Sequence, residues 1–285
     1  MCWLGESRGD TKDIRIVFVK DKSFFAFQVC FLAHSMDMKT LFFLGVLFIH
    51  MAMTMGDFYD ITVQGEPSLR TKCESWRVNA EIGNAIGWVV IPSGCEAYVR
   101  SYMLGGQYLS DVDLMVQEAM SYASKVQLEG GGRDAWVFDI DDTVLSHILY
   151  YSEHHFGAKP FNRTSWVEWE NLSAAPAIES IALLYNQLIN EHWSVFFLTG
   201  RSEKRRNVTE ENLQRAGFTK WAGLFLRQEG EDTLPAKVYK SAKRHELEMG
   251  GYRIWGNMGD QWSDLTGYST GERVFKVVNP MYCIP

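Results

Sequence analysis

Aspartates crowd one short stretch of the chain, where Asp139, Asp141 and Asp142 directly follow the apolar run at 135–138. A continuous apolar run of this length predicts a strand buried on both faces, which explains the run but not the acids after it. Like charges a few ångströms apart raise one another's pKa and destabilise a fold unless a cation neutralises them. Mg²⁺ prefers such oxygen ligands and keeps positions open for phosphate oxygens and water. The other interpretation is that the aspartates merely end the strand as Asx turns.

The next apolar run, at 194–198, also ends in residues that could bind an anion. It is followed by Thr199 and Gly200, and then by a helix for which Ser202 is an ordinary N-cap residue. A hydroxyl group together with free backbone N–H groups at a helix N-terminus forms a phosphate-binding element. Thr199 and Gly200 are therefore candidate phosphate-binding residues.

Two further acids and a cationic turn lie later in the sequence. Asp260 and Asp264 follow a glycine turn after another predicted strand, and the predicted helix at 238–249 carries Lys240 and Lys243. A charged turn of this sort is usually a solvated helix face, but a lysine there could also neutralise a bound phosphate. Ligands bind at the carboxyl ends of the strands of a parallel sheet, so the three strand-end motifs are expected at one edge.

Strands and helices alternate along this part of the chain. We expect strands at 135–138, 194–198, 224–226, 253–256 and 274–278, and helices at 110–129, 176–189, 203–216 and 238–249. Ser110 and Asp113 form a capping-box pattern for the first helix, and Pro176 suits the first turn of the second. The alternation predicts an α/β fold with a doubly wound, mainly parallel sheet and helices on both faces.

The composition bounds the class of protein. The chain has 285 residues, 46% of them hydrophobic, with a net charge of −7 and a pI near 5.6. That is enough for one large core or two small ones, and it excludes intrinsic disorder. An acidic chain repels polyanions, so we expect no nucleic-acid partner.

The N-terminal part of the sequence differs from the rest. Residues 1–56 carry apolar runs at 24–33 and 41–49, both too short for a spanning helix, so we expect no stable membrane span. The run at 41–49 follows Met36, Met38 and Lys39 and precedes small residues, as the hydrophobic region of a secretory signal peptide does. We therefore expect an extension plus signal peptide at 1–56, an N-terminal helical segment at 57–109 and the main domain at 110–285.

Export would change the chemistry open to several side chains. Cys73 and Cys95 are the closest pair of the five cysteines, so we expect a disulfide between them in an oxidising compartment, with Cys283 unpaired. Three Asn-X-Ser/Thr triplets would become N-glycosylation acceptors, at Asn162, Asn171 and Asn207. We expect the protein in the secretory pathway, extracellular or vacuolar.

Taken together, the motifs resemble those of a known family. DIDDT after one strand, LTGR after a second, a lysine-bearing helix and GDQWSD after a third are similar to the four signature motifs of the haloacid dehalogenase superfamily of phosphatases. CESWR, YMLGGQY, VYKSAKR and the closing NPMYCIP bring the chain closer to the plant acid phosphatase and vegetative storage protein family, the class B-like branch of that superfamily. The resemblance covers residues 73–285.

The resemblance implies how the candidate residues would act. Asp139 would be the nucleophile that forms an aspartyl-phosphate, and Asp141 the general acid and then the general base. Thr199 and the amide of Gly200 would hold the phosphoryl oxygens. In some storage members of the family a serine replaces the nucleophile, so the presence of Asp139 favours a working enzyme.

The resemblance also implies a lysine and a set of magnesium ligands. Lys240 would balance the charge of the nucleophile and the phosphate, with Lys243 as its rival because either spacing fits the motif. The Mg²⁺ ligands would be Asp139, Asp141 through its backbone carbonyl, Asp260 and, in a supporting position, Asp264. Asp142, which stands where many members have Glu, lies outside the reacting pair and is expected to matter little.

An aromatic-rich insert at about 147–175 separates the first two motifs. It contains Tyr150, Tyr151, Phe156, Phe161, Trp166 and Trp169. These rings could wall a pocket and stack on aryl or nucleotide leaving groups, although packing of a small helical insert explains most of them. His154 and His155 lack a partner at metal-ligand spacing, so we assign them no catalytic role.

The sequence therefore predicts a secreted or vacuolar acid phosphatase that hydrolyses small phosphate monoesters with Mg²⁺. The alternative is a nitrogen-storage protein in which phosphatase activity is incidental. A narrow nucleotidase or phosphotransferase using the same site is a third hypothesis. A homodimer stays open, because nothing in these residues sets the oligomeric state.

Overall fold

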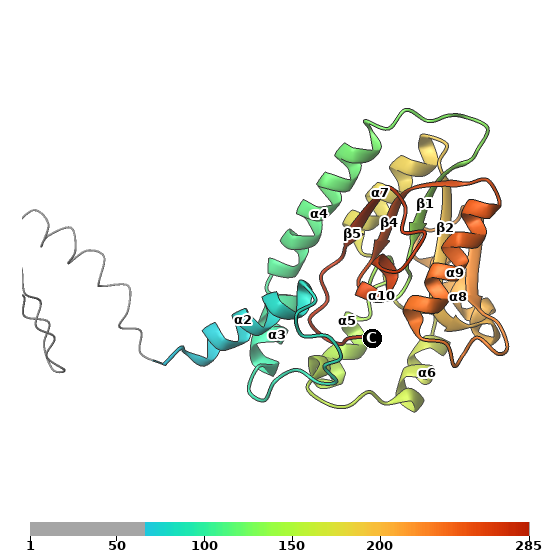
Figure 1. The fold of residues 1–285 in the computed structure, drawn as a ribbon. Coiled ribbons are helices and arrows are strands. Elements are labelled where there is room, and N and C mark those ends of the chain that lie inside the picture. Colours follow the sequence, from blue (N-terminus) through green and yellow to red (C-terminus); the bar gives the residue numbers. More distant parts are fainter. Residues whose placement is uncertain (1–65, 285) are drawn as a thin grey trace, which may run out of the picture. The chain divides into compact units, whose positions relative to one another are not determined.

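Five parallel strands form the sheet at the centre of the computed structural model, which describes residues 66–284 (Figure 1). The expected signal peptide falls within 1–65 and lies outside the described residues. The strands are β1 (Asp134–Phe138), β2 (Ser194–Ser202), β3 (Gly223–Arg227), β4 (Arg253–Gly259) and β5 (Arg273–Lys276). Their order is β3-β2-β1-β4-β5 and every neighbouring pair is parallel, which confirms the predicted α/β fold.

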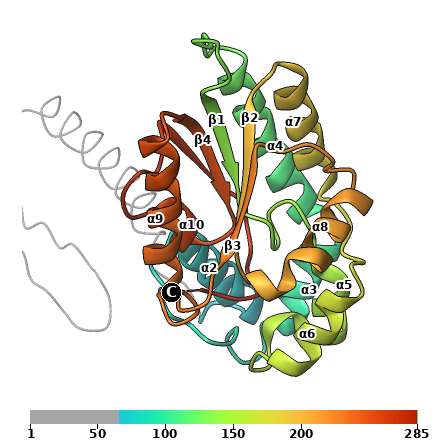
Figure 2. The same cartoon turned by 90° about the vertical axis from the view of Figure 1, so that its right-hand side faces the viewer.

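Helices cover both faces of the sheet, as Figure 2 shows with α9 on one side and α4 and α7 on the other. Their bounds are α4 (Gln107–Ala123), α7 (Glu179–Asn190) and α9 (Ala236–Met249). Side chains alternate along a strand, so Trp136 and Phe138 of β1 join the large core beneath α4 and α7. Ala135 and Val137 face the opposite way and pack with α9 in a second, smaller core. Both faces are therefore apolar, as the continuous run at 135–138 predicted.

Eight further helical segments complete the described chain. They are α2 (Leu69–Glu81), α3 (Glu96–Leu104), α5 (Ile148–Glu153), α6 (Arg163–Asn171), α8 (Arg206–Arg215) and α10 (Trp262–Leu265), with 3₁₀ turns η1 (His155–Gly157) and η2 (Glu203–Arg205). The aromatic-rich insert forms α5, η1 and α6, between β1 and α7. Within residues 66–284, none of the helices has the length and apolar character that crossing a bilayer requires.

Two helix starts differ from the sequence-based predictions. Ser110 does not cap α4, which begins three residues earlier after Gly106, and the Ser110 hydroxyl instead donates to the Gly106 carbonyl oxygen at 3.1 Å. Gly106 has a φ of 92°, a left-handed conformation that glycine adopts without a steric penalty. Pro176 does not open α7 either, because Ala177 still bridges to Leu145 in extended geometry and the helix begins only at Glu179.

The strand order places a ligand-binding edge at β1. The chain runs from β1 to β2 and β3 on one side of β1, then crosses to β4 and β5 on its other side. Loops diverge at the carboxyl edge of such a switch point and leave a crevice for ligands. The pairing of β2 with β3 is interrupted between Leu198 and Ser202, so Thr199, Gly200 and Arg201 leave the regular ladder at this edge.

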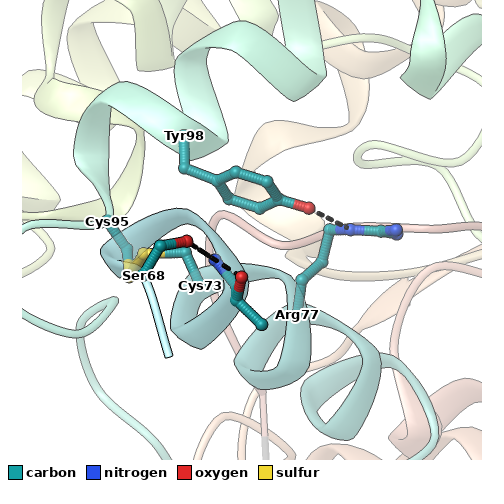
Figure 3. Close-up of a disulfide and its surroundings, with 6 residues drawn as sticks. Ser68, Cys73, Arg77, Cys95 and Tyr98 are labelled. Carbon is teal, nitrogen blue, oxygen red and sulfur yellow. Dashed lines mark hydrogen bonds between the residues drawn. A yellow bond between two sulfur atoms is a disulfide. The ribbon is translucent and has the colours of Figure 1, made fainter. Parts of the chain in front are cut away.

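A disulfide fastens the helical segment that precedes α4. Cys73 of α2 is bonded to Cys95, the residue before α3, and both are buried (Figure 3). Arg77 of α2 also donates to the Tyr98 hydroxyl of α3 at 3.1 Å. At the other end of α2, the Glu81 carboxylate accepts the backbone N–H of Asn279 at 2.9 Å. The segment therefore braces the C-terminal residues that lie beside the carboxyl edge of the sheet.

Candidate active site

Three of the predicted acids meet at the carboxyl edge of the sheet. Asp139 follows β1, Asp260 follows β4, and Asp264 lies in α10. One carboxylate oxygen of each lies within 4.8 Å of those of the other two, and all three side chains are buried. Gly259 permits this approach, because a Cβ at that position would lie 2.4 Å from the Asp264 side chain. The structure thus brings together acids that are about 120 residues apart in the sequence.

Lys240 of α9 points into this cluster, whereas Lys243 does not. The Lys240 ammonium donates to Asp139 Oδ1 and to Asp264 Oδ1, both at 2.5 Å. Burial works to lower the pKa of Lys240, but the attraction of the two carboxylates outweighs it and raises the pKa. Lys243 instead pairs at 3.0 Å with glutamates away from the cluster. Of the two rival lysines, Lys240 is the one placed to balance charge at the site.

The acid cluster fits a divalent cation. One lysine faces three buried carboxyl groups, so ionising all three would leave negative charge in excess unless a cation balances it. Burial raises the pKa of Asp139 well above its usual range, and burial together with the Asp264 carboxylate raises the pKa of Asp260 to about 7. Hard oxygen donors with excess negative charge are the ligands that Mg²⁺ and similar cations prefer. The donor set is therefore suited to the metal that the sequence resemblance implies.

Amide and hydroxyl groups hold Asp260 in place. Asn279 Nδ2 and Gln261 Nε2 donate to Asp260 Oδ2 at 2.6 and 2.7 Å. The backbone N–H of Asp260 donates to the Thr143 hydroxyl at 3.0 Å, and that hydroxyl donates to Asp139 Oδ2 at 3.2 Å. Thr143 therefore links the first motif to the last. Thr143 and Asn279 were not among the predicted site residues, although both lie within the motif strings DIDDT and NPMYCIP.

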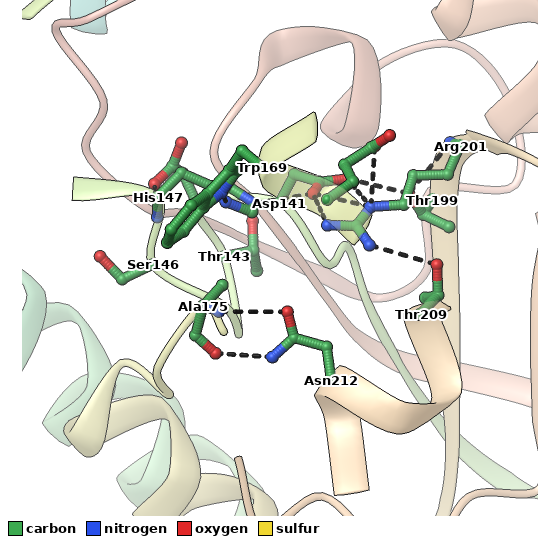
Figure 4. A network of polar contacts seen from close by, with 12 residues as sticks. Asp141, Thr143, Ser146, His147, Trp169, Ala175, Thr199, Arg201, Thr209 and Asn212 are labelled. Carbon is green, nitrogen blue, oxygen red and sulfur yellow. Dashed lines mark hydrogen bonds and ion pairs between the residues drawn. The ribbon is translucent and has the colours of Figure 1, made fainter. Parts of the chain in front are cut away.

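The Asp141 carboxylate faces a separate set of donors (Figure 4). Asp141 Oδ1 accepts Arg201 Nη2 at 2.6 Å and lies 2.7 Å from His147 Nε2, and Asp141 Oδ2 accepts the Thr199 hydroxyl at 3.1 Å. Burial opposes ionisation of Asp141, but Arg201 and His147 together outweigh it and lower the pKa. These donors hold the carboxylate, whereas the metal ligand that the resemblance implies is the backbone carbonyl of Asp141. The Asp141 side chain is 20% exposed, so it is partly accessible to solvent.

The predicted phosphate-binding residues lie beside Asp141. Thr199 is fully buried, and its hydroxyl also accepts the backbone N–H of Arg201 at 3.1 Å. Gly200 is exposed, and a Cβ added there would meet nothing within 4 Å. The open space beside the Gly200 backbone leaves room for the oxygens of a ligand. Ser202 caps η2 by accepting the backbone N–H of Lys204, as its position predicted.

Two further residues of the site, His147 and Glu170, were missed by the sequence analysis, and Trp169 was considered only as a pocket wall or as packing. His147 follows the first motif and bonds to Asp141, and the Trp169 indole N–H donates to His147 Nδ1 at 2.8 Å. Glu170 lies 3.5 Å from Arg201 and 3.4 Å from Arg205. The position of His147 directly after DIDDT was the available signal, whereas Trp169 and Glu170 are brought in by the fold of α6.

The aromatic insert divides into two groups. Tyr150, Tyr151 and Phe161 line a cavity of about 320 Å³ together with Tyr282. Trp166 and Trp169 instead pack around the His147 ring. The two other insert histidines lie on the cavity wall: His154 donates to the Tyr150 carbonyl oxygen at 2.7 Å, and His155 pairs with Glu96 at 3.1 Å. Neither belongs to the acid cluster found among the described residues.

The three glycosylation triplets all begin with an exposed asparagine. Asn162 caps α6, with its Oδ1 accepting the backbone N–H groups of Thr164 and Ser165. Asn171 ends α6, and Asn207 lies in the first turn of α8. Each of the three asparagines is therefore at the surface, where glycan attachment requires it.

The fold and the site together define a class of protein. A buried carboxylate follows the central strand, a threonine and glycine follow the next, a lysine comes from a covering helix, and two acids follow the strand on the other side. This is the arrangement of a haloacid dehalogenase-type protein, and it matches the class that the motifs predicted.

Comparison with known proteins gives the family within that class. Residues 61–285 match the model of the HAD superfamily, subfamily IIIB (acid phosphatase). The chain therefore belongs to the subfamily IIIB acid phosphatases of the HAD superfamily. This confirms the resemblance inferred from the motifs.

Named relatives include an acid phosphatase, a stem glycoprotein and a vegetative storage protein. The chain is 44% identical over 213 residues to acid phosphatase 1 of Solanum lycopersicum, covering 75% of this chain and 84% of the relative. It is 39% identical over 255 residues to the stem 28 kDa glycoprotein of Glycine max, covering 87% of this chain and 100% of the relative. It is 37% identical over 215 residues to vegetative storage protein 1 of Arabidopsis thaliana, covering 75% of this chain and 79% of the relative.

A solved structure shares the fold. The class C acid phosphatase from Bacillus anthracis is similar with a TM-score of 0.54 at 19% sequence identity, covering 65% of this chain and 83% of that one. The likeness supports the parallel sheet and its covering helices.

Proposed function

We propose that this protein is a Mg²⁺-dependent acid phosphatase that hydrolyses phosphate monoesters through an aspartyl-phosphate at Asp139. One observation carries the proposal: Asp139 is buried at the carboxyl end of the central strand, 2.5 Å from Lys240 and within an acid cluster suited to a cation. A carboxylate in that position can attack phosphorus while the lysine and cation neutralise the charge of the phosphoryl group.

The first step transfers the phosphoryl group to the protein. A carboxylate oxygen of Asp139 forms a bond to phosphorus, and the bond from phosphorus to the leaving oxygen breaks. The electron pair goes to the leaving oxygen, which takes the proton from the Asp141 carboxyl group and departs as an alcohol. Thr199, the Gly200 amide and Lys240 hold the phosphoryl oxygens during the transfer.

The second step returns the protein to its starting state. Asp141, now a carboxylate, takes a proton from a water molecule whose oxygen forms the new bond to phosphorus. The bond from phosphorus to Asp139 breaks, its electron pair returns to the carboxylate, and inorganic phosphate leaves. Mg²⁺ held by Asp139, Asp260 and the Asp141 carbonyl, with Asp264 beside them, would supply charge neutralisation and a template for the phosphoryl group.

Substrate binding would also prepare Asp141 for its role as an acid. In the structure Arg201 and His147 hold the Asp141 carboxylate and lower its pKa, which disfavours the protonated form. A phosphate dianion bound at Thr199 and Gly200, the neighbours of Arg201 in the chain, would compete with Asp141 for the guanidinium group. Loss of that ion pair removes the strongest attraction that keeps Asp141 ionised.

The test is hydrolysis of an aryl phosphate by the purified protein. We expect turnover with Mg²⁺, loss of turnover after treatment with a chelator, recovery when Mg²⁺ is returned, and no turnover by Asp139→Asn. Asp232→Asn, a change at an exposed aspartate, serves as the control and should keep full activity. Full activity of Asp139→Asn, or turnover that no chelator affects, would contradict the proposal.

Nitrogen storage is the second candidate function, favoured by the similarity to vegetative storage protein 1. The rate of phosphate ester hydrolysis distinguishes the two functions, because a storage protein does not need a working nucleophile. A purified, correctly folded protein that hydrolyses neither aryl nor alkyl phosphates with Mg²⁺ would favour storage.

We also propose that the chain is exported and glycosylated. The buried disulfide between Cys73 and Cys95 suits an oxidising compartment, and the three triplet asparagines are exposed. The relatives from Glycine max are named as stem glycoproteins. N-terminal sequencing of the mature protein tests the signal peptide, and a mature chain that begins before Met36 would overturn it.

A further inference from the structure

We propose that His147 is a positioning residue, which holds the Asp141 carboxylate in place for proton transfer, and that Trp169 fixes the tautomer of His147 that allows this. The proposal rests on the proposed function, in which Asp141 is the general acid. It adds a role for two residues of the insert that the motifs do not contain.

Hydrogen-bond chemistry assigns the tautomer of His147. An indole N–H is only a donor, so the atom that it reaches must be an acceptor. The Trp169 indole N–H lies 2.8 Å from His147 Nδ1, which therefore carries no proton. The neutral ring then has its proton on Nε2, and this N–H donates to Asp141 Oδ1 at 2.7 Å (Figure 4). A ring nitrogen fixed by one partner so that the other can orient a functional group is a recurring arrangement in enzyme sites.

The ring of His147 is held so that it cannot turn freely. Its side chain is fully buried. The centroid of its ring lies 4.6 Å from that of Trp166 and 6.2 Å from that of Trp169, and both contacts are edge-on. The backbone N–H of His147 donates to the carboxylate of Asp142 in the same loop at 2.8 Å. Backbone, ring faces and both ring nitrogens are therefore all fixed, and the direction of the Nε2–H bond is fixed with them.

His147 differs from the other donors to Asp141 in what a substrate does to it. Arg201 and Thr199 lie at the phosphate-binding end of β2, so a bound phosphate dianion draws on both. His147 approaches from the insert side, and its ring is enclosed by tryptophans. It therefore remains bonded to Asp141 when the phosphate has taken the other donors, which is when Asp141 must point at the leaving oxygen.

The leaving group provides a readout that a purely structural role would not move. The ratio kcat/KM covers the steps up to departure of the leaving group. An alkoxide is a poor leaving group and needs the proton from Asp141, whereas 4-nitrophenolate is stable without it. A misplaced Asp141 therefore slows glycerol 3-phosphate more than 4-nitrophenyl phosphate. A general loss of fold or of Mg²⁺ slows both substrates by the same factor.

The test compares variants of the Mg²⁺-loaded protein with these two substrates. We expect His147→Phe, which keeps a ring but removes the donor, to lower kcat/KM for the alkyl ester about tenfold more than for the aryl ester, within the range of acid–base catalysis. His147→Gln places an amide N–H near the same position and should restore the ratio to within about threefold of wild type. Trp169→Phe should shift the ratio in the same direction as His147→Phe.

Trp166→Phe is the matched control. It also removes an indole N–H beside the His147 ring, but that N–H donates to Glu170 at 2.9 Å and not to His147. Phenylalanine keeps an aromatic ring beside His147, so we expect the ratio of the two substrates to stay unchanged, with any effect of the lost bond to Glu170 lowering both rates by the same factor. If His147→Phe does not fold, the contrast between Trp169→Phe and Trp166→Phe, with His147→Gln active, carries the same test.

The outcomes separate this proposal from the proposed function. Suppose that Asp141→Asn slows the alkyl ester more than the aryl ester, but that His147→Phe or Trp169→Phe slows both esters equally. That result would overturn the role of His147 and leave the general-acid role of Asp141 intact. An Asp141→Asn variant without that dependence would remove the general-acid role and the role of His147 with it. Activity of Asp139→Asn would overturn the proposed function itself.

Discussion

Replacing Lys240 by methionine should strongly destabilise the protein when no metal is bound. The Lys240 ammonium lies 2.5 Å from both Asp139 Oδ1 and Asp264 Oδ1, and all three side chains are at least 93% buried. Breaking a buried ion pair by removing one partner typically costs about 3–5 kcal/mol, because the remaining charge stays buried without compensation. A whole domain is stable by only about 5–15 kcal/mol, so the loss is large but measurable.

Lys243→Met is the matched comparison, since it removes the same charge from the same helix. The Lys243 side chain is 13% exposed, and it pairs with Glu231 and Glu246, whose side chains are 23% and 55% exposed. Because both glutamates reach solvent, removing the lysine leaves no fully buried charge, and the loss should be about 1 kcal/mol, smaller than in Lys240→Met. The measurement is urea unfolding followed by circular dichroism in buffer with a chelator.

Mg²⁺ should narrow the difference in the free energy of unfolding between Lys240→Met and wild type. Without the lysine the acid cluster carries more negative charge and binds a cation more tightly, and binding to the folded state adds stability by mass action. Activity should fall by about a hundredfold or more in Lys240→Met, as expected for loss of a charge that stabilises the transition state, and should persist in Lys243→Met. If the two variants lose equal stability in the chelator buffer, Lys240 does not neutralise the cluster and the reasoning is wrong.

Three other predictions follow from particular contacts. Asn279→Leu removes a 2.6 Å hydrogen bond to Asp260, so Mg²⁺ affinity by calorimetry should fall about 10–100-fold, and an unchanged affinity would show that Asn279 does not orient this ligand. The double change Cys73→Ala and Cys95→Ala removes a disulfide between residues that are 22 positions apart, so the free energy of unfolding should fall by about 3 kcal/mol. Equal stability of the variant and wild type would exclude a structural role of the bond. Burial raises the pKa of Asp260 to about 7, so ionising it lowers stability as the pH rises from about 4 to about 7. Metal-free wild type should therefore lose stability relative to Asp260→Asn across that window, whereas a constant difference would contradict the assigned pKa.

The edge of the sheet at which the motifs meet could be predicted from the sequence for a simple reason. Asp139 follows one predicted strand directly and Asp260 follows a glycine turn after another, and parallel strands bring their carboxyl ends to the same edge whatever the loops between them do. The choice between Lys240 and Lys243 could not be made in this way. It depends on the rotation of α9 against the sheet, which packing of Tyr239 and Leu247 sets and periodicity alone does not.

The contacts around Asp141 lay beyond the sequence for a different reason. His147 and Trp169 are 22 residues apart, and the hydrogen bond between them forms only because α6 folds back over the first motif. Side chains in such an insert show no periodic signal of their function, so the sequence left Trp169 between a pocket wall and packing. The start of α4 was misplaced because the left-handed conformation of Gly106 overrides the capping pattern at Ser110. Local pattern thus predicted the elements, and tertiary contacts decided the roles.

Trapping of the phosphorylated protein tests the central claim most directly. The Mg²⁺-loaded protein is mixed with 4-nitrophenyl phosphate, quenched in acid during turnover, digested and analysed by mass spectrometry. The account predicts one phosphoryl group on the peptide that contains Asp139, removable by hydroxylamine as an acyl phosphate and absent in Asp139→Asn. A phosphoryl group on another residue, or sustained turnover by Asp139→Asn, would contradict it.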